Sequence, residues 1–147
     1  MKPSAIKKDL VKKTKTAVAI AQPEVYDEFQ EALDQYYGEF SPRLYIRTYQ
    51  LKNSLRRSPI RPIGNGHEAD VYYNPAGLNY VMGHVLLRNG EYGWNTWSGV
   101  EVFESAAHGS HGGYKSGTAI WDEPYAVINA TARSILAKAC RAAGIPI

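Results

Sequence analysis

Apolar residues recur at every third or fourth position along the first forty residues, and this period constrains the fold more than any other feature. The stripe consists of Ile6, Leu10, Val11, Ala17, Val18, Ala21, Val25, Phe29, Leu33, Tyr36 and Tyr37. This spacing predicts one face of an amphipathic helix. Pro23 falls inside the run, and a proline removes a helical hydrogen bond and clashes with the preceding turn. Since the stripe keeps its phase past Pro23, we expect a long or kinked N-terminal helix, and favour two pieces that share roughly one face.

The charges along the chain fall into three blocks of alternating sign. Residues 1–16 hold six lysines and one acid, residues 24–39 hold six acids and no base, and residues 43–61 hold six bases and no acid. We therefore expect a basic N-terminal helical arm at 1–22, followed by a single α+β domain at 23–147. The acidic block 24–39 and the basic block 43–61 are adjacent in the sequence and opposite in sign, so we expect them to pair within the chain or between neighbouring copies.

Short elements are expected after the first forty residues. Residues 45–57 are predicted to form a short second helix, because Leu51 and Leu55 are four residues apart and so share a helix face. The two prolines that follow forbid a helix and predict extended chain. Candidate strands lie at 67–74 and 78–87, where apolar, aromatic and β-branched residues gather.

The next segment combines a turn signal with a helix start. Residues 88–99 are predicted to form a turn and an aromatic loop, because Asn89-Gly90 is a strong hairpin turn signal. Ser98 is followed three residues later by Glu101, which is the spacing of a capping box. We therefore expect a short helix at 99–107.

The C-terminal part contains a glycine-rich loop and a closing helix. Residues 108–118 hold four glycines and are predicted to form a flexible loop. An apolar helical face begins after Trp121 and stops at Gly144 and Pro146. The predicted fold class is therefore α+β, with a small, mostly antiparallel sheet and the C-terminal helix packed on it.

Composition excludes several classes of protein. A length of 147 residues suits one domain, and a single cysteine excludes a disulfide framework or a multi-cysteine zinc site. No apolar run approaches the length of a membrane span, and no signal peptide pattern is evident, so we expect an intracellular soluble protein. Cys140 falls inside the closing helix, where cysteines are mostly buried and inert. We predict no catalytic residue and no cofactor.

Two alternatives remain open on residue chemistry. His108 and His111 are three residues apart in the glycine loop, and a metal-dependent hydrolase centred there is one alternative, although the spacing matches no established metal signature. The basic segments 2–15 and 43–61 would neutralise phosphates, with tryptophans and tyrosines stacking on bases. A nucleic-acid-binding module is therefore the other alternative.

A motif and the order of the elements carry a family resemblance. The motif Y-x-R-T-x-x-L-x-x-S reads Tyr45-Ile46-Arg47-Thr48-Tyr49-Gln50-Leu51-Lys52-Asn53-Ser54. It is followed by DVYYNPAGLNY at 70–80, VFESAAHGSHGG at 102–113 and a closing helix at 121–147. Over residues 25–147 this order resembles the tail-completion and head–tail joining proteins of long-tailed bacteriophages. Members of that family often have glycine after the threonine, where this chain has Tyr49.

The resemblance implies a structural virion role without catalysis. It implies a ring-forming homo-oligomer at the phage neck or tail, which contacts neighbouring neck or tail proteins and transiently contacts DNA passing through the lumen. It implies no membrane partner. The expected location is the virion, and the host cytoplasm during assembly.

Subunit contacts in such a ring would use charged and aromatic side chains. The Arg47 guanidinium has the geometry to hold a carboxylate of this or a neighbouring subunit, and Thr48 would cap the following helix; an intrachain cap and salt bridge is an equally weighted interpretation of both. The candidate interface residues are Arg47, Thr48, Arg56, Arg57, Glu28, Glu31, Tyr114, His108, His111, Trp94 and Trp97. We expect the glycine loop 108–118 and the basic arm 1–16 to become ordered on assembly.

Overall fold

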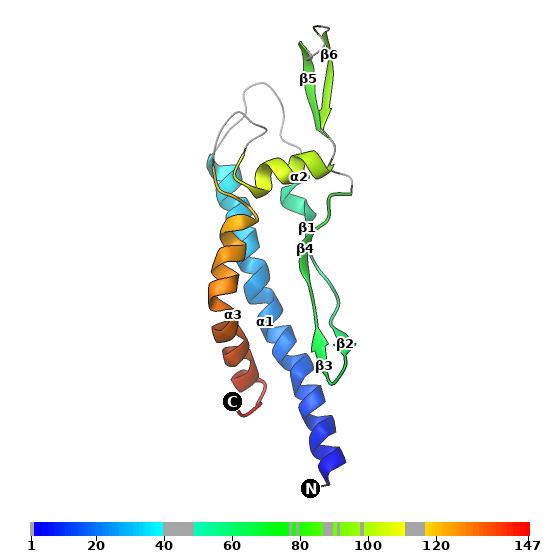
Figure 1. The fold of residues 1–147 in the computed structure, drawn as a ribbon, viewed down its shortest axis with the longest axis vertical. Coiled ribbons are helices and arrows are strands. Elements are labelled where there is room, and N and C mark those ends of the chain that lie inside the picture. Colours follow the sequence, from blue (N-terminus) through cyan, green and yellow to red (C-terminus); the bar gives the residue numbers. More distant parts are fainter. Residues whose placement is uncertain are drawn as a thin grey trace. The chain divides into compact units, whose positions relative to one another are not determined.

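The computed structural model describes residues 2–39, 49–76, 78, 80–86, 90, 92–97, 99–110 and 117–147 (Figure 1). For residues 80–86 and 92–97 the description covers the backbone. The chain has the expected α+β class, with a long N-terminal helix, short antiparallel strands and a C-terminal helix. It divides into two compact units: unit 1 comprises residues 1–28, 56–72 and 125–147, and unit 2 comprises residues 29–55 and 73–124.

The N-terminal helix α1 (Pro3–Glu39) is long, as the apolar stripe predicts. The expectation of two pieces is wrong, because the helix is assigned without interruption through Pro23. A proline in a helix interior costs roughly 3 kcal/mol, and packing on both sides of Pro23 offsets that cost. Ala17 and Ala21 are buried before it, and Phe29 and Leu33 are buried after it.

Among the described residues, the strands form three two-stranded sheets. β1 (Leu55–Arg57) pairs with β4 (Val71–Tyr73), β2 (Arg61–Ile63) with β3 (Gly66–Glu68), and β5 (Tyr80–Leu86) with β6 (Tyr92–Trp97). The β2–β3 and β5–β6 pairs are antiparallel, and the second has a register irregularity between Val81 and His84. Every one of these strands has a hydrogen-bonded neighbour on one side only, within the part of the chain that the structure describes.

The predicted helix at 45–57 is wrong in its described part. Residues Lys52–Ser54 form a single 3₁₀ turn, η1, and Leu55–Arg57 form strand β1. Leu51 and Leu55 are both buried, so the spacing correctly indicated burial. Pairing with β4 determines the backbone conformation here, because tertiary contacts override weak helix propensity.

Other predicted elements need smaller corrections. The aromatic loop at 88–99 is wrong, because Tyr92–Trp97 is strand β6, whose conformation is set by pairing with β5. The strand predicted at 67–74 is divided into β3 and β4. The helices α2 (Gly99–Ala107) and α3 (Asp122–Ala142) confirm the predictions from the capping-box spacing and from the closing apolar stripe.

Unit 2 has a core of large apolar side chains. Phe29, Tyr73, Phe103 and Trp121 contact one another, with ring centroids 5.1–6.4 Å apart. The Tyr73 hydroxyl donates a hydrogen bond to the Ile120 carbonyl oxygen over 3.1 Å, so this buried polar tip is satisfied. Other buried apolar residues of unit 2 include Leu33, Leu51, Leu55, Leu78 and Ile120.

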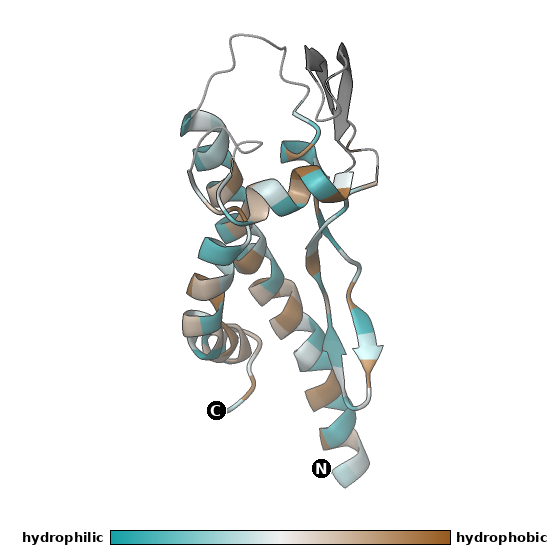
Figure 2. Cartoon of the chain, turned by 45° about the horizontal axis from the view of Figure 1, so that its top comes forward, coloured by the Kyte–Doolittle hydropathy of each residue, from teal (hydrophilic) through white to brown (hydrophobic). Residues whose placement is uncertain are grey.

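Unit 1 has a narrower core between two helices. In this unit α1 and α3 lie side by side (Figure 1), and Ala17 and Ala21 of α1 are buried together with Ile135 and Ala139 of α3. Partly buried residues around them are Ile20, Ile128, Cys140, Ala143 and Ile145. On the first turns of α1, hydrophobic residues lie among hydrophilic ones (Figure 2). The side chains of Ile6 and Leu10 remain 53% and 45% exposed there.

Candidate functional site

The described part of the Y-x-R-T-x-x-L-x-x-S motif, residues 49–54, has an unusual backbone conformation at its first residue. Tyr49 has a φ of +56°, in the left-handed region that costs a non-glycine residue roughly 1–2 kcal/mol. Its ring stacks on Tyr37, with centroids 5.3 Å apart, and its carbonyl oxygen accepts a bond from the Asn53 amide. Position 49 therefore requires the conformation that glycine adopts most easily.

The leucine and the serine of the motif, Leu51 and Ser54, are buried and hold the local backbone. Leu51 is 2% exposed and Ser54 is 3% exposed. The Ser54 hydroxyl donates to the Leu51 carbonyl oxygen over 2.7 Å, and the Ser54 carbonyl oxygen accepts from the Asn74 amide. Because both residues are buried and bonded within the chain, they fix the backbone of residues 51–54.

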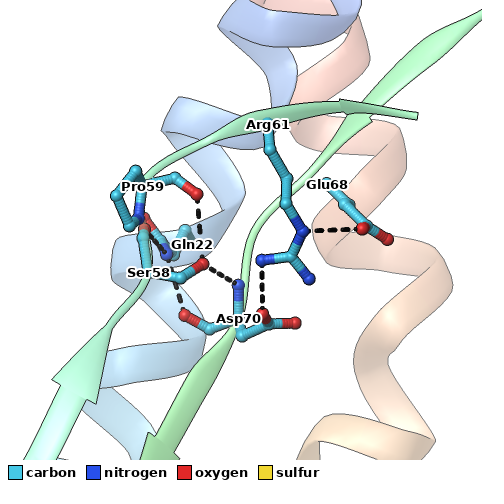
Figure 3. Close-up of polar contacts among 6 residues, drawn as sticks. All are labelled: Gln22, Ser58, Pro59, Arg61, Glu68 and Asp70. Carbon is cyan, nitrogen blue, oxygen red and sulfur yellow. Dashed lines mark hydrogen bonds and ion pairs between the residues drawn. The ribbon is translucent and has the colours of Figure 1, made fainter.

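A second site lies at the neck of the β2–β3 hairpin, in unit 1 (Figure 3). The Gln22 amide nitrogen, on α1, donates to the carbonyl oxygens of Ser58 and Asp70 over 3.0 and 2.9 Å. The Ser58 and Asp70 main chains also bond to each other, and the Asp70 amide donates to the Ser58 hydroxyl oxygen. One glutamine side chain thus joins the helix to both arms of the hairpin.

The same neck carries a branched ion pair. The Arg61 guanidinium contacts Glu68 through Nε at 2.8 Å and Asp70 through an Nη atom at 2.7 Å. The Asp70 hydrogen bond and then the Glu68 hydrogen bond raise the pKa of Arg61 further above its ordinary value. All three side chains are about half exposed, so the cluster fixes the shape of the hairpin more than it stabilises the fold.

The two ends of the glycine loop are fastened within unit 2. On one side, the Tyr36 hydroxyl donates to the Ser110 carbonyl oxygen over 3.0 Å. On the other side, the Glu39 carboxylate accepts bonds from the Thr118 amide and hydroxyl. The Gly117 amide donates to the Gly109 carbonyl oxygen over 2.7 Å. The loop therefore leaves and returns to the body at adjacent points.

His108 joins the end of α2 to the start of α3. Its Nδ1 lies 2.7 Å from an Asp122 carboxylate oxygen, and its Nε2 lies 3.6 Å from Glu104. The hydrogen bond and charge of Asp122, with a smaller contribution from Glu104, raise the pKa of His108 above its ordinary value of 6.5. The side chain is 62% exposed, which leaves it open to a partner.

The structure describes some of the predicted interface residues. Arg47, Thr48, His111 and Tyr114 lie outside the described residues, and Trp94 and Trp97 are placed by the backbone of β6 opposite His84 and Tyr80. Arg56 is exposed in β1, and the Arg57 guanidinium lies 5.0 Å from the centre of the Tyr26 ring. Glu28 is half-buried and Glu31 is exposed on α1.

The expected pairing of acidic and basic blocks is realised between Lys52 and Asp34. The Lys52 ammonium lies 2.6 Å from an Asp34 carboxylate oxygen. By contrast, Arg61 pairs with residues beyond both blocks, and Glu24 pairs with Lys138 at 3.2 Å. Within the described ranges, the two blocks are therefore joined through the Lys52–Asp34 contact.

Two kinds of feature are absent from the described part of the chain: a metal-binding cluster and a membrane-spanning helix. No group of three or more His, Cys, Asp or Glu side chains there is arranged to hold a metal ion. Among those same residues, no helix is long and apolar enough to cross a membrane. Comparison of the chain with protein families, curated proteins and solved structures finds no match.

Sequence reasoning missed the hairpin neck. Gln22 carries no signal, because a single glutamine before a proline predicts no particular contact. Arg61 and Glu68 do give a signal in the sequence, since they flank the turn at Gly64 symmetrically and pair across the strands. Opposite charges at directly opposed positions of a hairpin attract each other, so the turn signal was sufficient to predict that pair.

Proposed function

We propose that this chain is a structural virion protein of a phage neck or tail, which acts in tail completion or head–tail joining through ring assembly and subunit contacts, without catalysis. The backbone at Tyr49 carries the proposal. The phage family often has glycine directly after the motif threonine, and the residue at that position here has a φ of +56°, which glycine favours. The local geometry thus supports the resemblance at the point where the two sequences differ.

The strands give a second line of support. The described strands occur in pairs, and a two-stranded hairpin is at best marginally stable alone in water. Open strand edges also favour pairing with another chain. An assembling subunit would use such edges in contacts with its neighbours, whereas a protein that acts alone would be expected to cover them.

Exposed apolar side chains in unit 1 agree with a contact role. Large apolar residues of α1, β2, β4, α3 and the C-terminal end are 43–66% exposed: Ile6, Leu10, Ile63, Tyr72, Tyr125, Val127, Leu136 and Ile147. Burial of apolar area is the main favourable contribution to most protein association. Subunit assembly would remove these side chains from water.

Deletion of the coding sequence from the genome that carries it tests the proposal. We expect unjoined heads and tails to accumulate, complementation to restore infectious particles, and mass spectrometry of those particles to detect the chain. Infectious particles of normal yield that lack the protein would overturn the proposal, whatever the purified chain does in solution.

A further inference from the structure

Three lysines form one face at the start of α1. Lys8, Lys12 and Lys15 are exposed and follow the i, i+4, i+7 spacing, which places them within roughly 60° of one another around a helix. None of the three has an ion-pair partner among the described residues. Lys13 differs from them, because it is paired with Asp9 at 2.9 Å. We call these three residues the lysine face.

Three acids repeat that spacing further along the same helix. Asp27, Glu31 and Asp34 are exposed and also follow the i, i+4, i+7 spacing. Asp27 and Glu31 have no ion-pair partner among the described residues. Asp34 contacts Lys52 but keeps a side chain that is 54% exposed. We call these three residues the acidic face.

The two faces match under one translation along the helix. Each acid follows its lysine by the same number of positions: Asp27 follows Lys8, Glu31 follows Lys12, and Asp34 follows Lys15. Two parallel copies of α1, shifted so that Lys8 of one lies beside Asp27 of the other, would therefore set every lysine of the first face against an acid of the second. Within one helix, each lysine is separated from its matching acid by several turns, and helical side chains reach only three or four positions along. The faces therefore remain available for another molecule.

We propose that the lysine face of one copy of this chain binds the acidic face of a neighbouring copy, with their α1 helices parallel and in the register that sets Lys8 against Asp27. The contact uses two different surfaces, so each copy offers one of each to its neighbours. Such a head-to-tail interface generates a ring when the helices of neighbouring copies run in the same direction but cross at an angle, so that a closing rotation relates the copies. Strictly parallel helices with this axial shift would build an open filament instead. The inference deepens the proposed function, and its part in a virion ring rests on that function.

A second copy explains more of the observations than a polyanion does. Nucleic acid would account for the lysine face through phosphate neutralisation. It would not account for an exposed acidic face of equal spacing on the same helix, since that face would repel phosphates. Complementary charge arranged in one register instead favours orientation and selection of a protein partner.

Charge reversal of the purified full-length chain tests the proposal. One variant carries Lys8→Glu and Lys12→Glu, a second carries Asp27→Lys and Glu31→Lys, and a third carries all four changes. We expect each double variant to weaken self-association, measured by sedimentation equilibrium, about tenfold or more, because attractive pairs become repulsive ones. The quadruple variant restores complementarity, and we expect its self-association to return to that of the unmodified chain.

A matched control distinguishes the effect of the lysine face on self-association from the effect of net charge. Lys2→Glu with Lys7→Glu changes the net charge by the same amount as the first variant, but at positions outside the lysine face. We expect little change in self-association for this control. Circular dichroism of every variant should retain the helical signal, because all the substituted positions are exposed.

Cross-linking distinguishes the parallel register from an antiparallel one. In a Cys140→Ser background, Lys8→Cys chains are mixed with Asp27→Cys chains and treated with a short bis-maleimide. We expect a cross-linked dimer from this mixture and none from Lys8→Cys mixed with Asp34→Cys. The reverse pattern would indicate an antiparallel pair and would overturn the proposed contact.

Other outcomes would also overturn the proposed contact between copies. A chain that stays monomeric up to its solubility limit overturns the inference, as does a quadruple variant that fails to recover. If the lysine changes instead abolish salt-dependent binding to a DNA duplex and leave self-association unchanged, the lysine face serves nucleic acid. Each result is obtained without virions, so it stands apart from the deletion experiment on the proposed function.

Discussion

Units 1 and 2 are built around side chains of different size. Unit 2 buries aromatic and branched residues, such as Phe29, Leu33 and Ile120, which are at most 4% exposed. The buried cluster of unit 1 consists of Ala17, Ala21, Ile135 and Ala139, and most of the large apolar residues that stay exposed belong to unit 1. Since buried apolar area is the dominant stabilising contribution, unit 2 has the larger buried side chains, and the exposed apolar side chains of unit 1 agree with the proposed contact role.

The polar contacts also differ between the two units. In unit 1, the hairpin is held to α1 by a Gln22 amide and is shaped by an exposed Arg61 ion pair. In unit 2, Glu39 and Tyr36 bond the loop ends beside a packed core. Exposed polar contacts contribute little to stability but define geometry. Exposed polar contacts therefore define the geometry of the hairpin in unit 1, and packing stabilises unit 2.

The largest expected effect comes from truncating a leucine in the core of unit 2. Leu33 is fully buried, so Leu33→Ala should lower the free energy of unfolding by about 2–5 kcal/mol through lost burial and a cavity. The matched change in unit 1, Leu136→Ala, should cost less than about 1 kcal/mol, because Leu136 is 53% exposed. Urea denaturation measures both, and equal losses would contradict the contrast between the units.

The free energy of unfolding of variants at Tyr49 should depend on backbone strain at that position. Tyr49→Val should destabilise the chain by about 1–2 kcal/mol, because a β-branched residue at positive φ is a steric outlier. Tyr49→Gly relieves the strain but loses the ring contact with Tyr37, so its free energy of unfolding should stay within about 1 kcal/mol of the unmodified value. If both variants lost the same stability, side-chain packing would be the cause.

Removal of the Gln22 amide should loosen the hairpin locally. Gln22→Ala deprives two carbonyl oxygens of a donor, at a cost of about 0.5–1.5 kcal/mol. Amide hydrogen exchange should accelerate in β2 and β3 and stay unchanged in unit 2. Gln35→Ala, at an exposed site of the same helix, serves as the control and should leave the hairpin protected. Unchanged exchange in Gln22→Ala would show that the strands hold without the amide.

The smallest expected effect is a pH dependence at the junction of α2 and α3. The folded pKa of His108 lies above its ordinary value of 6.5, so the contact with Asp122 stabilises fully below about pH 6.5 and is lost as pH rises through the raised pKa. An NMR titration should show the pKa fall in Asp122→Asn, and fall less in Glu104→Gln. A larger fall in Glu104→Gln would reverse the assigned causes.

Helices were the most predictable elements. The stripes that start at Ile6 and after Trp121 persist over many turns, so they identify α1 and α3 despite one proline. A spacing of three between a serine and a glutamate located α2 correctly. Such signals are local, which is why they can be read along the chain.

Strands and contacts were less predictable because they depend on partners far along the chain. Leu55 lies four residues after Leu51 and suggested a helix, but it pairs in β1 with a strand that begins at Val71. The β6 strand similarly depends on β5. The predicted interface residues were chosen by charge and aromatic character, whereas the hairpin neck depends on Gln22, which only the tertiary structure brings to Ser58.

Hydrogen exchange measured by mass spectrometry, in the free chain and in its assembled form, tests most directly that unit 1 is the assembling part. We expect new protection in peptides from residues 1–28, 56–72 and 125–147 and around Glu31 and Asp34 of the acidic face, and the same slow exchange of the buried core of unit 2 in both states. New protection confined to residues 29–55 and 73–124 would contradict the assignment. The absence of an assembled form, both in concentrated solution and in particles, would contradict it as well.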